Sequence, residues 1–483
     1  MNIKNNLVIR PSLTLSFLLL LSAFALPSLR AQTTESRIVI VHLRGVAESR
    51  ISVIPLTGSK AFKSIVEGSG VKNNETVFLV VPKQYLPGEF MLQFDSKKEP
   101  SDKPVTSQKN IFINNQDLEL WINPNYADSI RFQQGELENN AFVQFSKQNE
   151  KKRQQLAVLH DFLMNYGAIQ SGFYQQALKE YEQQRGAHNQ SLRSAEKRDK
   201  NLFVSSIYQL NYIPTTPFTG SEPDKIKGVI QHYFDGMDFR DTLVIRTAEM
   251  IKWMDAYVNL YSRLCTTKAL RDSLLPAAAR QAIEKAKGGH PLVYGWMVDY
   301  FYRGFESNQL PEGLKVLEPY TRDPNCLTSK RLQIEKRLLG MQLLTVGAKA
   351  PNIILKDAAG NLFDLSTTQP VAGRILLLFY SSGCSHCTDL IKELKPWFDE
   401  LPVLTRPEVV AVSLDDNETD IKNWGSLISG LPEWKHLRAE GINSPVANDY
   451  FLLSTPVMIL LDSHTKEIMA LPSSFTELKT NIR

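Results

Sequence analysis

The chain has 483 residues, of which 22% are charged and 43% hydrophobic, and its formal net charge is +4. This length exceeds what one hydrophobic core usually serves, so we expect roughly two to four domains. The composition excludes long disordered or fibrous stretches. The charge is too weak to indicate a nucleic-acid partner or an anionic membrane, so no nucleic acid is expected among the partners.

The N-terminus has the composition of a secretion signal. Lys4 and Arg10 precede an apolar stretch over residues 13–26, shorter than the roughly 20 apolar residues of a membrane-spanning helix. This order predicts a signal peptide over residues 1–31, cleaved near Ala31, and export to the periplasm. The alternative is an uncleaved membrane anchor, and a loose membrane association is compatible with either.

Residues 32–135 alternate between short runs of β type and turn residues such as Gly68 and Gly70. Several short strands with regular turn signals predict a small antiparallel β-sandwich-like domain. The expected strands are 37–43, 51–56, 77–81, 89–94, 111–113, 118–122 and 129–132.

Residues 136–343 change to apolar positions at three- and four-residue spacing, which predicts an all-helical region. The clearest helices are expected at 141–166, 174–185, 247–264 and 274–286, with a loop at 212–224. Two of the four cysteines, Cys265 and Cys326, lie here. They could form a structural disulfide or stay as two separately buried thiols, and the sequence favours neither.

The pattern changes again at residue 344, where short strands are expected at 352–356 and 362–365. The apolar run 374–380 suits a central strand buried on both faces. Cys384 and Cys387 follow it directly in a C-x-x-C, and a helical stretch begins behind them. The cysteines therefore lie at a strand-to-helix junction.

That junction has a chemical consequence, because a helix N-terminus stabilises a nearby anion. Cys384 is expected to ionise and act as the nucleophile in disulfide exchange. Cys387, one turn later, is placed to resolve the mixed disulfide. A protonated His386 would favour the thiolate further, which predicts a more oxidising couple.

Two other chemistries use cysteines in similar settings. Zinc needs four ligands, and the sequence offers no second C-x-x-C, so no metal is expected. A peroxiredoxin-type peroxidase has a proline and a threonine ahead of its reactive cysteine. Leu377 and Ser381 occupy those positions here, which disfavours a thiol peroxidase.

The downstream sequence continues an α/β pattern. A strand-type run at 409–414 and a helical segment to residue 428 indicate a β-α crossover. Thr455-Pro456 then leads into another apolar run at 457–462, and a proline at the start of a strand suits a cis bond.

These features resemble the thioredoxin superfamily, and within it the TlpA/ResA-like exported thiol–disulfide oxidoreductases. The resemblance is carried by the lead-in at 346–352, the hairpin at 355–361, the C-x-x-C and the Thr455-Pro456 step. It implies a thioredoxin-like α/β fold over 344–483. It also implies that Pro456 is cis and shapes the substrate groove, and that Thr455 offers its backbone to the substrate. Protein thiols or disulfides are the implied partners, together with a separate redox partner protein and without a cofactor.

The sequence departs from the family pattern at three positions. Gly383 replaces the tryptophan that usually precedes the first cysteine, which is expected to loosen the loop. Leu378 replaces the buried aspartate of thioredoxin proper, so the proton acceptor for Cys387 is unidentified. Lys392 stands where many relatives have a proline that kinks the helix.

The sequence as a whole predicts an exported thiol–disulfide oxidoreductase with Cys384 and Cys387 as its catalytic pair. A binding or scaffold protein with an accessory thioredoxin-like domain is the main alternative, because residues 32–343 have no assigned chemistry. A thiol peroxidase is a more distant one.

Overall fold

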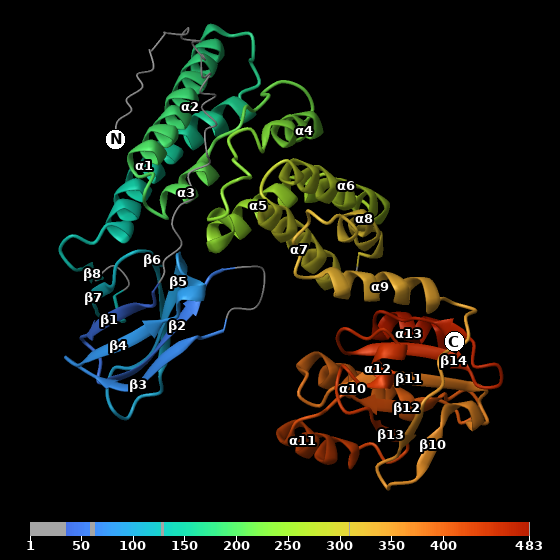
Figure 1. Ribbon diagram of the computed structural model, residues 1–483. Helices are drawn as coiled ribbons and strands as arrows, with labels where there is room; N and C mark the ends of the chain where they lie inside the picture. The colour runs from blue at the N-terminus through green and yellow to red at the C-terminus, as the bar shows by residue number, and fades with distance from the viewer. Residues whose placement is uncertain (1–34, 58–62, 127–129, 309, 483) are drawn as a thin grey trace, which may run out of the picture.

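The computed structural model describes residues 35–57, 63–126, 130–308 and 310–482, and the expected signal peptide lies outside them. A β-rich part, a helical part and an α/β part follow one another along the chain (Figure 1). The predicted fold class is confirmed. Among the described residues, no helix combines the length and the apolar character that crossing a membrane requires.

The β-rich part is a sandwich of two four-stranded sheets, in the orders β4-β1-β7-β8 and β3-β2-β5-β6. Its core draws apolar side chains from both sheets. All neighbouring strands run antiparallel except β1 and β7, which are parallel. The strands are β1 (Arg37–Leu43), β2 (Glu48–Pro55), β3 (Val66–Lys72), β4 (Thr76–Val81), β5 (Gly88–Lys97), β6 (Val105–Ile113), β7 (Leu118–Ile122) and β8 (Arg131–Phe132), and a short 3-10 helix, η1 (Lys83–Tyr85), joins β4 to β5.

Strand β3 was expected to be a turn because of Gly68 and Gly70, and that prediction is wrong. The two glycines instead lie within β3, where its pairing with β2 shifts register between Ser49 and Ile51. Gly70 has φ +67°, and a Cβ on Gly68 would lie 2.7 Å from Val77 Cγ2. Glycine in a strand therefore marks a bulge and a close approach here, rather than a chain reversal. Of the strand expected at 129–132, residue 129 lies outside the described residues.

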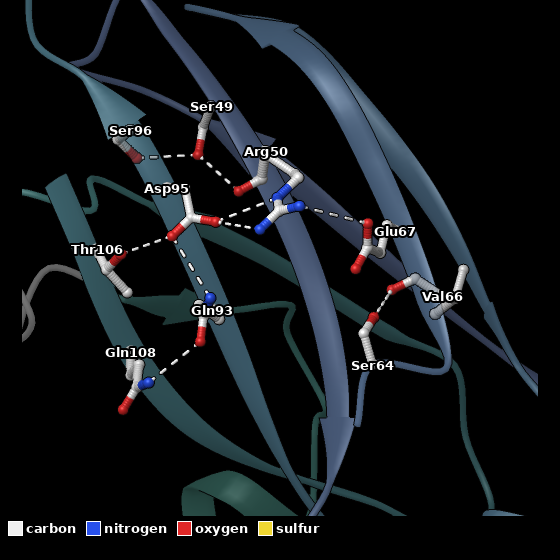
Figure 2. A network of polar contacts seen from close by, with 10 residues as sticks. All are labelled: Ser49, Arg50, Ser64, Val66, Glu67, Gln93, Asp95, Ser96, Thr106 and Gln108. Carbon is white, nitrogen blue, oxygen red and sulfur yellow. Dashed lines mark hydrogen bonds and ion pairs between the residues drawn. The ribbon is translucent and has the colours of Figure 1, made fainter. Parts of the chain in front are cut away.

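The outward face of the sheet β3-β2-β5-β6 carries a polar network centred on Asp95 (Figure 2). Its carboxylate accepts hydrogen bonds from Thr106 Oγ1 at 2.6 Å and from Arg50 Nη2 at 2.8 Å. These bonds hold the pKa of Asp95 below its usual range, with the Thr106 bond as the largest cause. Polar side chains on three neighbouring strands show why this face can stay in water while the opposite face packs into the sandwich.

The helical part begins with α1 and α2, which run side by side as a long hairpin (Figure 1). All four predicted helices are present. Helix α2 continues beyond residue 185, through Gly186, and ends at Arg198. The elements are α1 (Glu138–Asn165), α2 (Gly172–Arg198), α3 (Ser205–Tyr208), η3 (Gln209–Asn211), α4 (Glu222–His232), η4 (Val244–Arg246), α5 (Ala248–Ser262), α6 (Lys268–Lys287), α7 (Pro291–Ser307), α8 (Pro311–Thr321) and α9 (Arg331–Leu343).

The two cysteines of the helical part are free thiols, so of the two readings left open the structure shows unpaired sulfurs. Cys326 is buried, and burial raises the pKa of its thiol to about 11. Cys265 is partly exposed.

The α/β part is built on a five-stranded sheet in the order β13-β12-β11-β14-β15. Central strand β11 pairs parallel with β12 and antiparallel with β14. Helices α10 and α13 cover one face of the sheet. Helix α12 and the hairpin of β9 and β10 cover the other face, which is an arrangement of thioredoxin type. The elements are β9 (Ile354–Lys356), β10 (Leu362–Asp364), η5 (Leu365–Thr367), β11 (Arg374–Tyr380), α10 (Ser385–Glu400), β12 (Glu408–Ser413), α11 (Glu418–Ile428), β13 (Lys435–Arg438), α12 (Pro445–Asp449), β14 (Val457–Asp462), β15 (Ile468–Ala470) and α13 (Phe475–Ile482).

Candidate active site

The two cysteines of the C-x-x-C lie at the start of α10, directly beyond the end of β11. Cys384 is the N-cap residue, and its carbonyl accepts hydrogen bonds from Cys387 N and Thr388 N at 3.1 Å each. Cys384 is half-buried, whereas Cys387 is fully buried against the core under α10. Burial raises the pKa of the Cys387 thiol to about 12. One sulfur is thus accessible and the other is shielded behind it.

The chain segment before β14 forms the second wall of the site. Strand β14 runs antiparallel to β11, with Val457 opposite Phe379, so its beginning lies beside the end of β11. The Thr455–Pro456 peptide bond is cis, as the family resemblance implied. The carbonyl oxygen of Thr455 lies 3.7 Å from Cys384 Sγ. Thr455, Pro456 and Cys384 therefore share one surface.

His386 is exposed on the first turn of α10, between the two cysteines. It contributes to lowering the pKa of Asp389, although the hydrogen bond from Lys392 is the larger cause. Lys392 forms a 2.8 Å ion pair with Asp389 on the helix surface. Helix α10 does contain a proline, Pro396, one turn beyond Lys392. Among the described residues, no group of three or more His, Cys, Asp or Glu side chains is arranged to hold a metal ion.

The loop before the cysteines is braced by a residue that the sequence analysis did not single out. Asp415 is 1% exposed and follows β12. Its carboxylate accepts hydrogen bonds from Ser381 Oγ at 2.6 Å and from Ser382 N at 3.0 Å. A sequence signal existed, because a residue just after a strand parallel to β11 must lie beside the end of β11.

A second brace lies beside the glycine before Cys384. Ser382 Oγ donates a 2.7 Å hydrogen bond to the carbonyl oxygen of Asp420, on the first turn of α11. A Cβ on Gly383 would lie 2.6 Å from Asp420 Oδ1, so a larger residue there requires the Asp420 carboxylate to move. The expectation that Gly383 loosens the loop stays a prediction.

The face of β11 beneath the cysteines is apolar except at its end. Leu378 packs in the same buried cluster as Cys387 and has no group that could accept a proton. Tyr380, at the end of the strand, is also buried in this cluster. The buried acid of thioredoxin proper has no counterpart on this strand.

Part of the chain is similar to known proteins. Residues 346–467 match the model of the AhpC/TSA family, and no curated protein matches the chain. A solved thioredoxin-like protein from Bacteroides caccae aligns over 56% of this chain and 97% of its own, with 17% identity and a TM-score of 0.37. A thiol-disulfide oxidoreductase from Bacteroides fragilis aligns over 28% of this chain and 96% of its own, with 22% identity and a TM-score of 0.24. A thiol:disulfide interchange protein from a Bacteroides species aligns over 29% and 88%, with 25% identity and a TM-score of 0.23. The matched segment lies within the α/β part of the chain, whose sheet order is of thioredoxin type.

Proposed function

We propose that this protein is an exported thiol–disulfide oxidoreductase that acts on protein substrates through Cys384 and Cys387. One observation carries the proposal: Cys384 Sγ lies at the N-terminus of α10, 3.7 Å from the Thr455 carbonyl of the cis-proline segment, with Cys387 buried behind it. A helix N-terminus stabilises a nearby anion, and a thiolate is the attacking species in disulfide exchange.

The reaction proceeds in two exchanges. The Cys384 thiolate attacks a substrate disulfide, so a mixed disulfide forms and one substrate sulfur leaves as a thiolate. Cys387 then loses its proton and attacks Cys384 Sγ, which releases the second substrate sulfur and leaves an intramolecular disulfide. The backbone of Thr455 pairs with an extended substrate segment beside Pro456. A separate redox protein must restore the dithiol, since the substrate reaction oxidises it.

Turnover of insulin by the full chain tests the proposal. We expect wild type to reduce insulin with dithiothreitol as the electron source, and Cys384→Ser to lose that activity. Cys265→Ser is the matched control, because it removes a partly exposed thiol far along the chain from the C-x-x-C. Equal activity in wild type and Cys384→Ser would favour the scaffold alternative. Rapid hydroperoxide consumption that requires Cys384 would favour the peroxidase.

The redox potential of the Cys384–Cys387 pair shows whether the protein acts as an oxidant or as a reductant. His386 lies on the first turn of α10, where a positive charge favours the thiolate and therefore the reduced pair. We expect a potential above the thioredoxin value of about −270 mV, and a more negative potential in His386→Ala. A wild-type potential at or below that value would show that His386 does not have this effect.

Export is proposed from the sequence of residues 1–31. Fractionation of cells that make the full chain should place the protein in the periplasmic fraction, with its N-terminus near residue 32 by mass spectrometry.

A further inference from the structure

The ends of two parallel strands meet just before the C-x-x-C. In the register of β11 and β12, Tyr380 lies opposite Ser413. The pairing continues beyond the strands, because Leu414 N donates a 2.8 Å hydrogen bond to the carbonyl of Tyr380. Asp415, the next residue, is therefore directed at the loop that carries Ser381 and Ser382.

The carboxylate of Asp415 is saturated by hydrogen-bond donors. Oδ1 accepts from Ser381 Oγ and Ser382 N, and Oδ2 accepts from Ser382 N at 3.1 Å and from Ser413 Oγ at 2.7 Å. Within the described part of the chain, no lysine, arginine or histidine forms an ion pair with it, and Arg438 contacts only its backbone carbonyl at 3.4 Å. A carboxylate held in this way is suited to fixing its donors in place, since its acceptor sites are occupied.

The residue that Asp415 holds is bonded to the turn that carries both cysteines. The carbonyl of Ser381 accepts a 3.2 Å hydrogen bond from Cys384 N, which begins the turn into α10. The carbonyl of Cys384 in turn accepts a 3.1 Å hydrogen bond from Cys387 N. Ser381 thus links a buried carboxylate to the turn on which the two sulfurs lie.

We propose that Asp415 is a positioning residue for the resolving step: it anchors Ser381 and Ser382 and so fixes the turn that sets Cys387 beside Cys384. This inference rests on the proposed function and deepens it. The second exchange needs the Cys387 sulfur in line with Cys384 Sγ, so a turn held in a fixed position speeds this step. The first attack, by the more accessible Cys384, depends on Asp415 much less.

Ellman's reagent separates the two steps without a natural substrate. Cys384 attacks the aryl disulfide, and one thionitrobenzoate leaves as a mixed disulfide forms on Cys384. Cys387 then loses a proton and displaces the second thionitrobenzoate, so the dithiol becomes a disulfide and the reagent is reduced to two thiolates. The absorbance of thionitrobenzoate follows both releases in the full-length protein. All variants carry Cys265→Ser, which removes the other partly exposed thiol.

In Asp415→Ala we expect the second release to slow by at least about tenfold, because small misplacements of a reacting group have effects of this size. The first release should change far less. Asp415→Asn should restore most of the second rate, since its amide oxygen accepts from Ser381 and its NH₂ can donate to Ser413 Oγ. An unchanged second rate in Asp415→Ala would overturn the proposal. An Asn variant as slow as the Ala variant would also overturn it, because the charge rather than the anchoring would then matter.

A matched pair covers the case in which Asp415→Ala does not fold. Ser381→Ala and Ser413→Ala each remove one hydroxyl donor from the same carboxylate, at 2.6 and 2.7 Å, but only Ser381 belongs to the active-site loop. We expect the second release to slow in Ser381→Ala and to stay near wild type in Ser413→Ala. Equal second rates in the two variants would contradict the proposal. Failure to turn over insulin would instead count against the proposed function alone.

Discussion

The two junctions between the three parts of this protein are built differently. Where the β-sandwich meets the helices, Glu138 is 3% exposed and accepts hydrogen bonds from Phe203 N at 2.9 Å, Val204 N at 3.0 Å and Asn114 Nδ2 at 2.7 Å. The side chain of Phe112, from β6, belongs to the core of the helical part. The first two parts therefore share buried contacts.

The second junction joins α9 to the α/β part over residues 344–483, which we call the redox domain after its proposed function. Gly340 packs against Phe451, and Lys336 Nζ donates a 2.9 Å hydrogen bond to Asn448 Oδ1. The hydrophobic clusters on both faces of the redox sheet draw only on residues from 344 onward. We therefore expect the sandwich and the helices to unfold as one unit, while the redox domain has its own core and its own transition.

Removal of the buried carboxylate at the first junction should have the largest effect. In Glu138→Ala three buried donors lose their acceptor, and we expect the free energy of unfolding of the sandwich-helix unit to fall by about 3 kcal/mol or more. The transition of the redox domain should not move. Urea denaturation followed by circular dichroism and by thiol accessibility of Cys387 measures the two transitions. Glu150→Ala, an exposed change on the same helix, is the control.

Two glycines in helix interiors test how closely α9 packs at the second junction. A Cβ on Gly340 would lie 2.7 Å from Phe451 Cβ, whereas a Cβ on Gly304 of α7 has no neighbour within 4 Å. Gly340→Ala should therefore destabilise the docking of α9 by about 1–3 kcal/mol through overpacking. Gly304→Ala should stabilise its helix by about 0.5–1 kcal/mol. Equal shifts of the same sign in the two melting curves would show that Phe451 does not press on α9.

The pH dependence of the first junction has a defined sign. Glu89 of β5 accepts hydrogen bonds from Thr247 Oγ1 and Ala248 N at the helical part, and burial raises its pKa above the usual range. A raised pKa in the folded state stabilises the fold below the ordinary pKa, and this contribution is lost as pH rises through the folded value.

The free energy of unfolding of wild type should therefore increase relative to that of Glu89→Gln as pH falls from 7 toward 5. Denaturation of both proteins at a series of pH values measures the difference, in which all other carboxylates cancel. A difference that decreases on acidification would mean that Glu89 is not penalised by burial.

The smallest effect is expected on the outward face of the sandwich, at the network of Figure 2. Arg50 pairs with Asp95 at 2.8 Å, but its side chain is 51% exposed. Exposed ion pairs contribute little, so Arg50→Ala should lower the free energy of unfolding by less than about 1 kcal/mol, and less still at high salt. A larger loss of unfolding free energy, unchanged by salt, would show that this network contributes as much as a buried contact.

The elements that could be predicted from the sequence are those whose signals are local. The apolar run of β11 predicts a strand buried on both faces, and the spacing of Cys384 and Cys387 puts them on one turn of the following helix. The cis bond at Pro456 followed from the family pattern around Thr455-Pro456. These features need only neighbouring residues, so a linear pattern can carry them.

The distant residues that complete the site are brought together by the tertiary structure, and for Asp415 the sequence offered only the predicted β-α crossover as a signal. Asp415 is 34 positions from Ser381 and reaches it because β12 pairs parallel with β11, and Asp420 meets Gly383 because α11 begins at the same edge of the sheet. The order of strands in a sheet has no periodicity in the sequence, which is also why the parallel pairing of β1 and β7 and the strand through Gly68 could not be predicted. The positions of the two sulfurs follow from the local sequence, whereas the groups that brace the loop before them depend on how the strands pair.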